Sequence, residues 1–250
     1  MVVQHPLIEF DCSMDSLEPA VIMGLLKKND SLQEEALKIH VSYIADECAK
    51  RFKPRGVYKL FNPTICTLPP TYTEPAIKLV GTMMVFKGKT VYDRLKRATH
   101  CALLSVTLDS ETVIDTLREQ LCYNDFDSHI FDACCAMMLE RAADMISAEI
   151  IRVAREKTLY TDERLCPGEG DLPLNTRDQI LFYTQAEKRL GIHLTSESEP
   201  VPRLSLFGVI GMYDKTQKGR RRACGRCKYR DYCSIRAVGM NCHGDKGSFK

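Results

Sequence analysis

One short stretch, residues 164–174, constrains this chain more than any other. It places two prolines and two glycines around a single arginine, an acidic pair and a thiol, in the order Arg-Leu-Cys-Pro-Gly-Glu-Gly-Asp-Leu-Pro-Leu. Thr176 and Gln179 follow at the spacing of a helix capping box. The loop therefore leads into a helix N-terminus, whose unpaired N–H groups suit a polar or anionic ligand. An ordinary turn between two elements is the structural alternative.

The segments after this loop predict a helix and then a strand. Apolar residues recur at helical spacing from Thr176, and Gly191 is a typical C-cap. Gly-Ile-His-Leu-Thr follows at residues 191–195, and residues 204–212 form a nearly continuous apolar run. Such a run is typical of a buried strand.

This order of arginine, proline-glycine loop, helix, Gly-Ile-x-Leu-Thr and strand resembles the activation domain of cobalamin-dependent methionine synthase, most closely its free-standing versions. The resemblance is strong over residues 160–212, weaker over 56–160, and does not extend to the C-terminal tail. It implies an α+β fold, with a mixed, mainly antiparallel twisted sheet and packed helices, over residues 1–214.

The remaining pattern agrees with that fold class. Strands are expected at 56–61, 76–86 and 99–108, with a bulge or turn at Gly81 in the second. A capping box at Ser31 and Glu34 predicts a helix whose inward face carries Leu37, Val41, Ile44 and Cys48. A short helix is expected at 90–98. A second helix is expected from residue 109, and its inward face carries Val113, Ile114, Leu117 and Leu121. A long helix is expected at 127–157, with Cys134, Cys135, Met137 and Met138 in the core.

The resemblance implies a binding site for S-adenosylmethionine. In that site Arg164 supplies a planar fork for the ligand carboxylate, and Glu140 faces the ammonium or sulfonium. Residues 166–168 provide a narrow backbone edge, because Gly168 has no Cβ. The family has a tyrosine where this chain has Glu169, which would still attract a sulfonium. The site residues are therefore expected to be Glu140, Arg164, Cys166, Pro167, Gly168 and Glu169.

The alternative for Glu140 is a solvent-facing pair with Asp144, four residues away on one helix face. A second pattern, Asp127-x-His129 with Asp132 in place of a final glycine, nearly matches the motif by which cobalamin domains present a histidine to cobalt. It lies in a helical pattern without a glycine-rich groove after it, and we interpret it as coincidence. Cobalamin is therefore expected only in trans, on a partner.

The resemblance also implies a reaction. One electron and a methyl cation from S-adenosylmethionine regenerate methylcobalamin on a separate corrinoid protein or methionine synthase core, in methionine synthesis or corrinoid-dependent methyl transfer. A flavodoxin-like or other donor supplies the electron. No catalytic base or nucleophile is needed on this chain, because cobalt attacks the methyl group. The rival hypothesis is a non-catalytic docking or adaptor subunit of a corrinoid methyltransferase with a structural metal tail, so enzyme status stays open.

Charge divides the chain near Asp214. The net charge is only +2, but residues 215–250 hold eleven Lys and Arg against two Asp, which leaves the first 214 residues acidic. The N-terminus lacks a signal-peptide pattern, and no apolar run approaches the roughly 20 residues of a membrane span. With twelve cysteines, these features lead us to expect a reduced, cytoplasmic protein.

The basic tail carries four cysteines at the spacing C-x2-C-x5-C-x8-C: Cys224, Cys227, Cys233 and Cys242. This spacing resembles that of iron–sulfur proteins and predicts a small metal-binding module over residues 215–250. Structural zinc and an unmetallated tail are the alternatives, with His243 as a candidate ligand. The positive charge offsets metal thiolates or suits an acidic partner. The acidic body argues against nucleic acid as the partner.

Overall fold

The computed structural model describes residues 6–19, 22, 34–66 and 75–216. These residues form two compact units. A sheet unit holds residues 6–12, 53–66, 75–111 and 139–216, and a helical unit holds residues 13–19, 22, 34–52 and 112–138. In these ranges no helix is both long and apolar enough to cross a membrane. The predicted tail lies outside them from residue 217 on, so its boundary near Asp214 stays a prediction.

The sheet unit is built on five antiparallel strands in the order β1-β2-β6-β10-β7. The apolar runs expected at 56–61, 99–108 and 204–212 form its three middle strands, which confirms those predictions. In spatial order the strands are β1 (Leu7–Asp11), β2 (Arg55–Phe61), β6 (His100–Thr107), β10 (Ser205–Tyr213) and β7 (Tyr160–Thr161).

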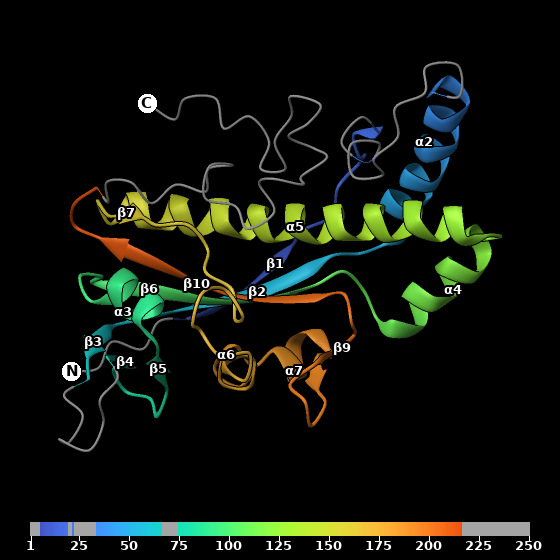
Figure 1. Cartoon of the computed structure of the whole chain (residues 1–250). Helices are drawn as coiled ribbons and strands as arrows, with labels where there is room; N and C mark the ends of the chain where they lie inside the picture. The colour runs from blue at the N-terminus through green and yellow to red at the C-terminus, as the bar shows by residue number, and fades with distance from the viewer. Residues whose placement is uncertain (1–5, 20–21, 23–33, 67–74, 217–250) are drawn as a thin grey trace. The chain divides into compact units, whose positions relative to one another are not determined.

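Both faces of this sheet are covered. The second part of α5 (Asp125–Glu156) lies over one face, and α6 (Thr176–Thr184) and α7 (Ala186–Leu190) lie over the other (Figure 1). Every residue of β6 except His100 is buried, which explains its continuous apolar sequence. A buried hydrogen bond of 2.8 Å between the hydroxyls of Ser105 and Thr184 ties α6 to β6.

The segment expected as one strand at 76–86 forms a hairpin instead. β4 (Ala76–Leu79) and β5 (Val85–Lys87) pair antiparallel, and β3 (Pro63–Ile65) completes this small sheet. Gly81 has φ 77°, which marks the turn that the sequence suggested at this residue. The expected short helix follows as α3 (Lys89–Leu95), and a two-stranded ribbon joins β8 (His193–Leu194) to β9 (Pro200–Val201).

The helix after the proline-glycine loop differs from its prediction in two respects. Thr176 is its first residue and Asn175 its N-cap, without a side-chain capping bond, so the predicted capping box with Gln179 is wrong. The helix also breaks at Gln185, which adopts the left-handed conformation and separates α6 from α7. The predicted end at Gly191 is confirmed, with φ 72°.

The helical unit contains α2 (Glu34–Arg51), most of α4 (Glu111–Leu121) and the first part of α5. Val41, Ile44 and Cys48 are buried as predicted, while the side chain of Leu37 and the capping residue Ser31 lie outside the description. On α4, Ile114, Leu117 and Leu121 are buried, but Val113 is exposed, contrary to prediction. Cys134, Cys135, Met137 and Met138 are core residues, as predicted.

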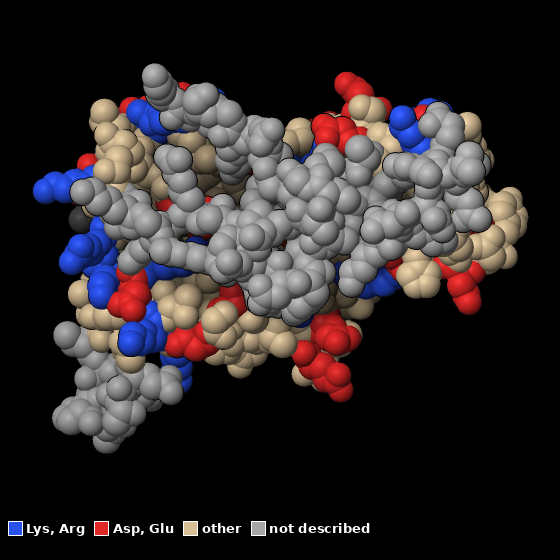
Figure 2. Space-filling view, turned by 45° about the horizontal axis from the view of Figure 1, so that its top comes forward, with Lys and Arg blue, Asp and Glu red and all other residues tan. Residues whose placement is uncertain are grey.

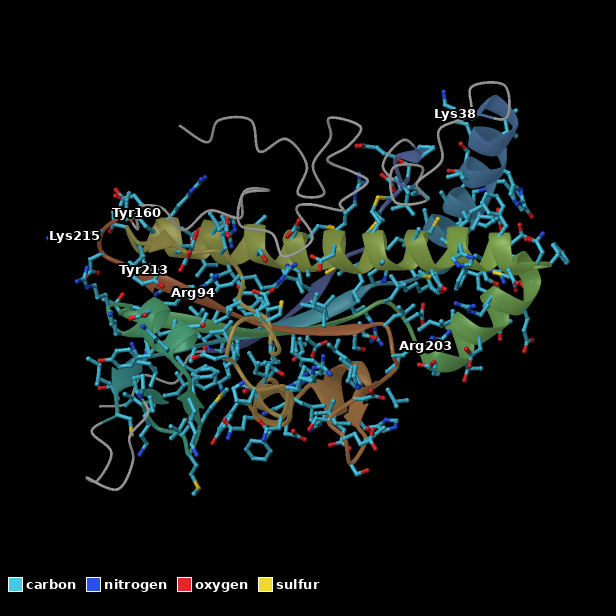
Figure 3. All side chains as sticks on the ribbon, in the orientation of Figure 1. Lys38, Arg94, Tyr160, Arg203, Tyr213 and Lys215 are labelled. Atoms are coloured by element: carbon cyan, nitrogen blue, oxygen red, sulfur yellow. The ribbon has the colours of Figure 1, made fainter. Side chains whose placement is uncertain are left out.

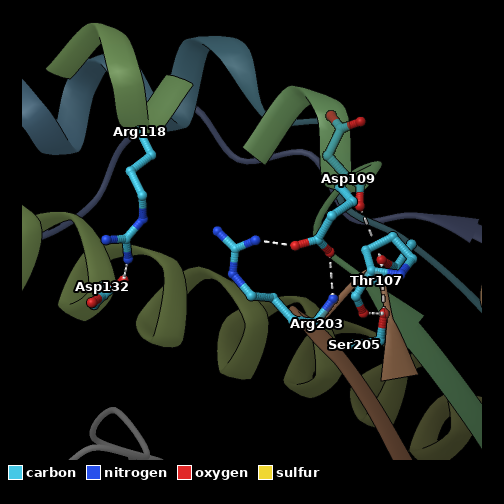
Figure 4. Close-up of polar contacts among 8 residues, drawn as sticks. Thr107, Asp109, Arg118, Asp132, Arg203 and Ser205 are labelled. Atoms are coloured by element: carbon cyan, nitrogen blue, oxygen red, sulfur yellow. Dashed lines mark hydrogen bonds and ion pairs between the residues drawn. The ribbon is translucent and has the colours of Figure 1, made fainter. Parts of the chain in front are cut away.

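Polar side-chain contacts lie near the start of α5 and at both ends of α4. In the helical unit, Asp127 lies 2.7 Å from His40 Nε2 and accepts from Tyr123 N, and together these bonds lower the pKa of its carboxyl group. Arg118 binds Asp132 (Figure 4). Two residues of the pattern at 127–132, Asp127 and Asp132, therefore take part in contacts between helices. In the sheet unit, Ser205 donates to Thr107 over 3.0 Å, also drawn in Figure 4, and Arg203 binds Glu111.

Gly191 offers a direct test of backbone strain. A Cβ at this position would meet no heavy atom within 4 Å, so only its left-handed conformation resists substitution. We expect Gly191→Ala to lower the free energy of unfolding by about 1 kcal/mol, measured by urea denaturation. Gly191→Asn is the control and should cost less, since asparagine tolerates this conformation. An alanine variant as stable as the original chain would contradict this account.

Candidate functional site

The segment before the proline-glycine loop is fixed to the edge of β10. Asp162 N donates to Gly211 O over 3.0 Å, and Leu165 and Val209 exchange two backbone hydrogen bonds of 2.9 Å. Because these bonds flank Arg164, its backbone is held at a defined height along β10.

The side chain of Arg164 is buried between β10 and α5. Only 2% of it is exposed, and its guanidinium binds the carboxylate of Glu140. The same group lies 3.4 Å from Asp144 Oδ1 and 3.4 Å from Ser147 Oγ. All three partners are on one face of α5, one turn apart, so the helix presents them together. Glu140 and Asp144 keep 50% and 37% of their side chains exposed.

The turn that follows is closed by its own backbone. Glu169 N donates to Cys166 O over 3.0 Å, and Gly168 N donates to Leu172 O over 2.8 Å. Gly168 has φ 93° and is exposed, whereas Pro167 is buried and Glu169 is half-buried. A conformation with positive φ explains the need for glycine here. The turn therefore offers a rigid backbone edge to solvent.

Asp171 joins this turn to α3, far away in the sequence. Its carboxylate accepts from Lys89 N over 2.6 Å and Thr90 N over 2.9 Å, at the start of that helix. A bond from the Thr90 side chain, followed by these backbone bonds, lowers the pKa of Asp171. Two glycines at positive φ allow this contact, because a Cβ on Gly88 would lie 2.9 Å from Asp171 O and one on Gly170 would lie 2.6 Å from Thr90 Oγ1.

The far end of α3 also contacts the strand side of the site. Arg94 Nη1 donates to Glu163 O over 3.1 Å, and the Tyr213 hydroxyl donates to Arg94 O over 2.7 Å. Figure 3 shows Arg94 and Tyr213 at the same end of β10. Both ends of α3 therefore brace the segment that contains Arg164 and the turn.

The structure brings together the residues that the sequence singled out from distant segments. Glu140 and Arg164 are in direct contact, and the turn residues Cys166, Pro167, Gly168 and Glu169 directly follow Arg164 in the chain. The expected roles of these residues toward a ligand are not tested by this arrangement and stay predictions. Glu140 and Asp144 are both partly exposed to solvent, as the alternative of a solvent-facing pair expects, and both also contact the buried guanidinium.

Several residues that contact Arg164 or the segment around it were not found from sequence. They are Arg94, Ser147, Asp162, Asp171 and Tyr213. Aspartate is a favoured helix cap, but this preference applies to the residue directly before a helix, which Asp171 is not. The helix it caps begins 82 residues earlier, however, and no local pattern connects the two.

Basic side chains gather at one end of the sheet unit, on the left of Figure 2. Arg97, Lys157 and Lys215 are exposed near the end of α3, the end of α5 and the end of β10. Partial burial, and then the charge of Lys157, lower the pKa of His100 there.

Within the described residues, no group of three or more histidine, cysteine or acidic side chains is arranged to hold a metal ion. The eight cysteines in these ranges are free thiols. Burial raises the pKa of Cys101, and a bond with Cys48 together with burial raises that of Cys134. Such thiols behave as apolar core groups. The four predicted metal ligands of the tail lie outside the described residues.

No family model matches the chain, and no curated protein matches it. Among solved structures, it superimposes on the crystal structure of the MetH reactivation domain bound to AdoHcy with a TM-score of 0.63, over 96% of this chain and 88% of that one, at 16% sequence identity. This chain has the fold of the MetH reactivation domain.

The reactivation-domain fold confirms the expected α+β class with its mainly antiparallel sheet and packed helices. Every strand pair within the described residues is antiparallel. At 16% identity the likeness establishes the fold, and function has to be argued from the site itself.

The contact between Asp171 and α3 predicts a pH-dependent contribution to stability. Because folding lowers the pKa of this carboxyl group, its contribution is complete at neutral pH and is lost as the pH falls through the folded-state pKa. We expect Asp171→Ala to lower the free energy of unfolding at pH 7 by about 1 kcal/mol, as for loss of a helix cap.

Urea denaturation at pH 7 and in acid, below the ordinary aspartate pKa, measures this contribution. The difference between Asp171→Ala and the original chain should shrink at the lower pH. Asp46→Asn, which removes an exposed carboxylate from α2, is the control and should change little at either pH. A loss from Asp171→Ala that is independent of pH would contradict a role for the ionised carboxylate.

Proposed function

We propose that this chain binds S-adenosylmethionine at residues 164–170 beside Glu140, and that it serves the reductive reactivation and remethylation of a separate cobalamin protein. The observation that carries the proposal is the contact between Arg164 and Glu140. It fixes a half-exposed carboxylate with a buried cation, two residues before the rigid turn, in a fold shared with the MetH reactivation domain that was solved bound to AdoHcy.

The chemistry of the site suits this ligand. S-adenosylmethionine carries an ammonium and a sulfonium, which the carboxylate of Glu140 would attract. The exposed backbone of Gly168 permits a close approach by the adenosine, and Cys166, Pro167 and Glu169 would form the rest of that edge. When bound, the ligand supplies the methyl cation, and a reductant supplies the electron that converts Co(II) to the attacking Co(I). The chain itself binds, orients and excludes water.

The burial of Arg164 bears on its role. A guanidinium that is 2% exposed and bound to Glu140 is better placed to orient that carboxylate than to form a new fork with a ligand. We therefore infer that Arg164 acts chiefly through Glu140, while the direct contact with the ligand carboxylate, expected from the resemblance, is the competing model.

Binding measurements with two ligands test the site and separate these models. We expect the chain to bind S-adenosylmethionine saturably in calorimetric titration, and Glu140→Gln to raise Kd about tenfold or more through loss of one charge contact. Glu149→Gln is a matched control, because it removes a carboxylate from the same helix that binds Arg152 instead. Glu149→Gln should bind like the original chain.

Decarboxylated S-adenosylmethionine supplies the second comparison. If Arg164 acts through Glu140, Arg164→Ala should weaken binding of both ligands to a similar extent. If Arg164 contacts the ligand carboxylate directly, the substitution should weaken only the intact ligand. Absence of saturable binding to the original chain would overturn the proposed ligand.

The rival proposal is an adaptor subunit that keeps the fold without ligand chemistry. Glu169, which stands where the family has a tyrosine, is the feature that favours it. In both proposals the partner is a corrinoid-binding protein or methionine synthase core. The proposal with S-adenosylmethionine also requires a flavodoxin-like or other electron donor. An adaptor would bind the corrinoid protein but not S-adenosylmethionine, so the titration above distinguishes the two.

The tail supports a further part of the proposal from sequence alone. We propose that Cys224, Cys227, Cys233 and Cys242 hold an iron–sulfur cluster, with structural zinc as the alternative. A cluster could deliver the electron that reactivation requires, whereas zinc has no redox chemistry.

Metal analysis after anaerobic purification distinguishes these proposals. A cluster predicts about three to four irons per chain and an absorption band near ~400 nm that dithionite bleaches. The variant Cys227→Ser should lose the metal, while Cys101→Ser, a substitution of a buried core thiol, should retain it. Stoichiometric zinc without visible absorbance would exclude the electron-transfer role.

A further inference from the structure

A glycine in the middle of β10 lies directly under the side chain of Arg164. A Cβ built on Gly208 would be 2.7 Å from Arg164 Cγ and 2.8 Å from Cδ, closer than real Cβ contacts allow. Its cross-strand neighbour on β6 is Leu104, whose Cγ would be 3.5 Å from the same Cβ, an ordinary contact. The arginine stem therefore occupies the space that a side chain at position 208 would fill.

Conformation does not explain this glycine. Gly208 is absent from the residues with positive φ, and it lies inside a regular antiparallel pairing with β6. Glycine weakens a strand interior, where it often marks the close approach of another group. Here that group is the stem of Arg164.

The stem has little freedom to move aside. The two hydrogen bonds between Leu165 and Val209 fix the backbone next to it, and Asp162 is held by Gly211 on the other side. With the backbone fixed, an added Cβ would displace the guanidinium itself. Its contacts with Asp144 and Ser147 are already 3.4 Å long, so a small displacement would break them.

We propose that Gly208 is a positioning residue of the ligand site. Because Gly208 leaves room for the stem of Arg164, the guanidinium lies beside α5 at the position where it binds Glu140. The effect of Gly208 on the arginine is independent of any ligand, whereas its effect on binding rests on the proposed function. The two effects are therefore measured separately.

Gly56 provides a matched control. It is also a glycine of the main sheet, on β2, and a Cβ there would lie 2.0 Å from Ile146 Cδ1 of α5. Gly56→Ala and Gly208→Ala thus both add a methyl group that meets a side chain, but only the second meets Arg164. A general effect of overpacking should appear in both variants.

The experiment is a double-mutant cycle of Gly208→Ala and Arg164→Ala on the full chain, with Gly56→Ala alongside. The midpoint of thermal unfolding tests whether a side chain at position 208 collides with the stem of Arg164. We expect Gly208→Ala to lower the midpoint by about 3–10 °C in the original chain, and by much less where Arg164→Ala has removed the stem. If Gly208→Ala fails to fold alone, recovery of folding in the double variant gives the same coupling.

Titration with S-adenosylmethionine reports the effect on the site. Gly208→Ala should raise Kd at least tenfold, while Gly56→Ala should lower the midpoint and leave Kd within about twofold. If Gly208→Ala lowers the thermal midpoint equally in the original chain and in Arg164→Ala, the proposed steric contact between position 208 and the stem of Arg164 is overturned. If the midpoint loss depends on Arg164 but Gly208→Ala leaves the Kd for S-adenosylmethionine unchanged, the role of Gly208 in binding is overturned. If the original chain does not bind S-adenosylmethionine, both that role and the proposed function are overturned.

Discussion

A positive charge buried inside the sheet unit is the constraint on which the candidate site depends. Burying a guanidinium is costly unless its charge and its N–H groups are satisfied. Glu140, Asp144 and Ser147, which α5 supplies on one face, offset the charge of Arg164 and accept from its two terminal nitrogens. The need to satisfy this charge therefore links three parts of the sheet unit. They are β10, where Gly208 leaves room for the arginine stem, the segment that contains Arg164, and α5, which contains the two carboxylates.

The turn after Arg164 is fixed by a different kind of contact. Its own hydrogen bonds close it, but its orientation depends on Asp171, which caps the distant helix α3. Because Gly88 and Gly170 lack side chains, the loop and the helix start can approach closely enough for this bond. A short helix that is weak by itself and this loop thus stabilise each other, and Leu172 is buried in the same hydrophobic core as Val91 and Leu95 of the helix. This mutual support gives a solvent-exposed turn the rigidity that a binding site needs.

The sequence was most informative where a single strong pattern decided the local structure. The continuous apolar run that became β6 and the left-handed C-cap at Gly191 were both predicted correctly, because burial and backbone strain act on the residue itself. It failed where two patterns competed. The segment at 76–86 became a hairpin, and Asn175 replaced Thr176 as the N-cap, since Thr176 is buried as the first residue of α6. Packing outweighed the capping preference there.

By itself, the sequence determined the α+β class, the turn chemistry of the proline-glycine loop and the residue types that could meet a charged ligand. Only the tertiary structure decided that Arg164 is buried against Glu140, that its stem lies against Gly208, and that Asp171 binds the start of α3. The physical reason is that turns and apolar periodicity are encoded within a few residues, whereas charge pairing and steric fit arise between segments far apart in the chain. Those contacts exist only once the sheet and α5 have packed together.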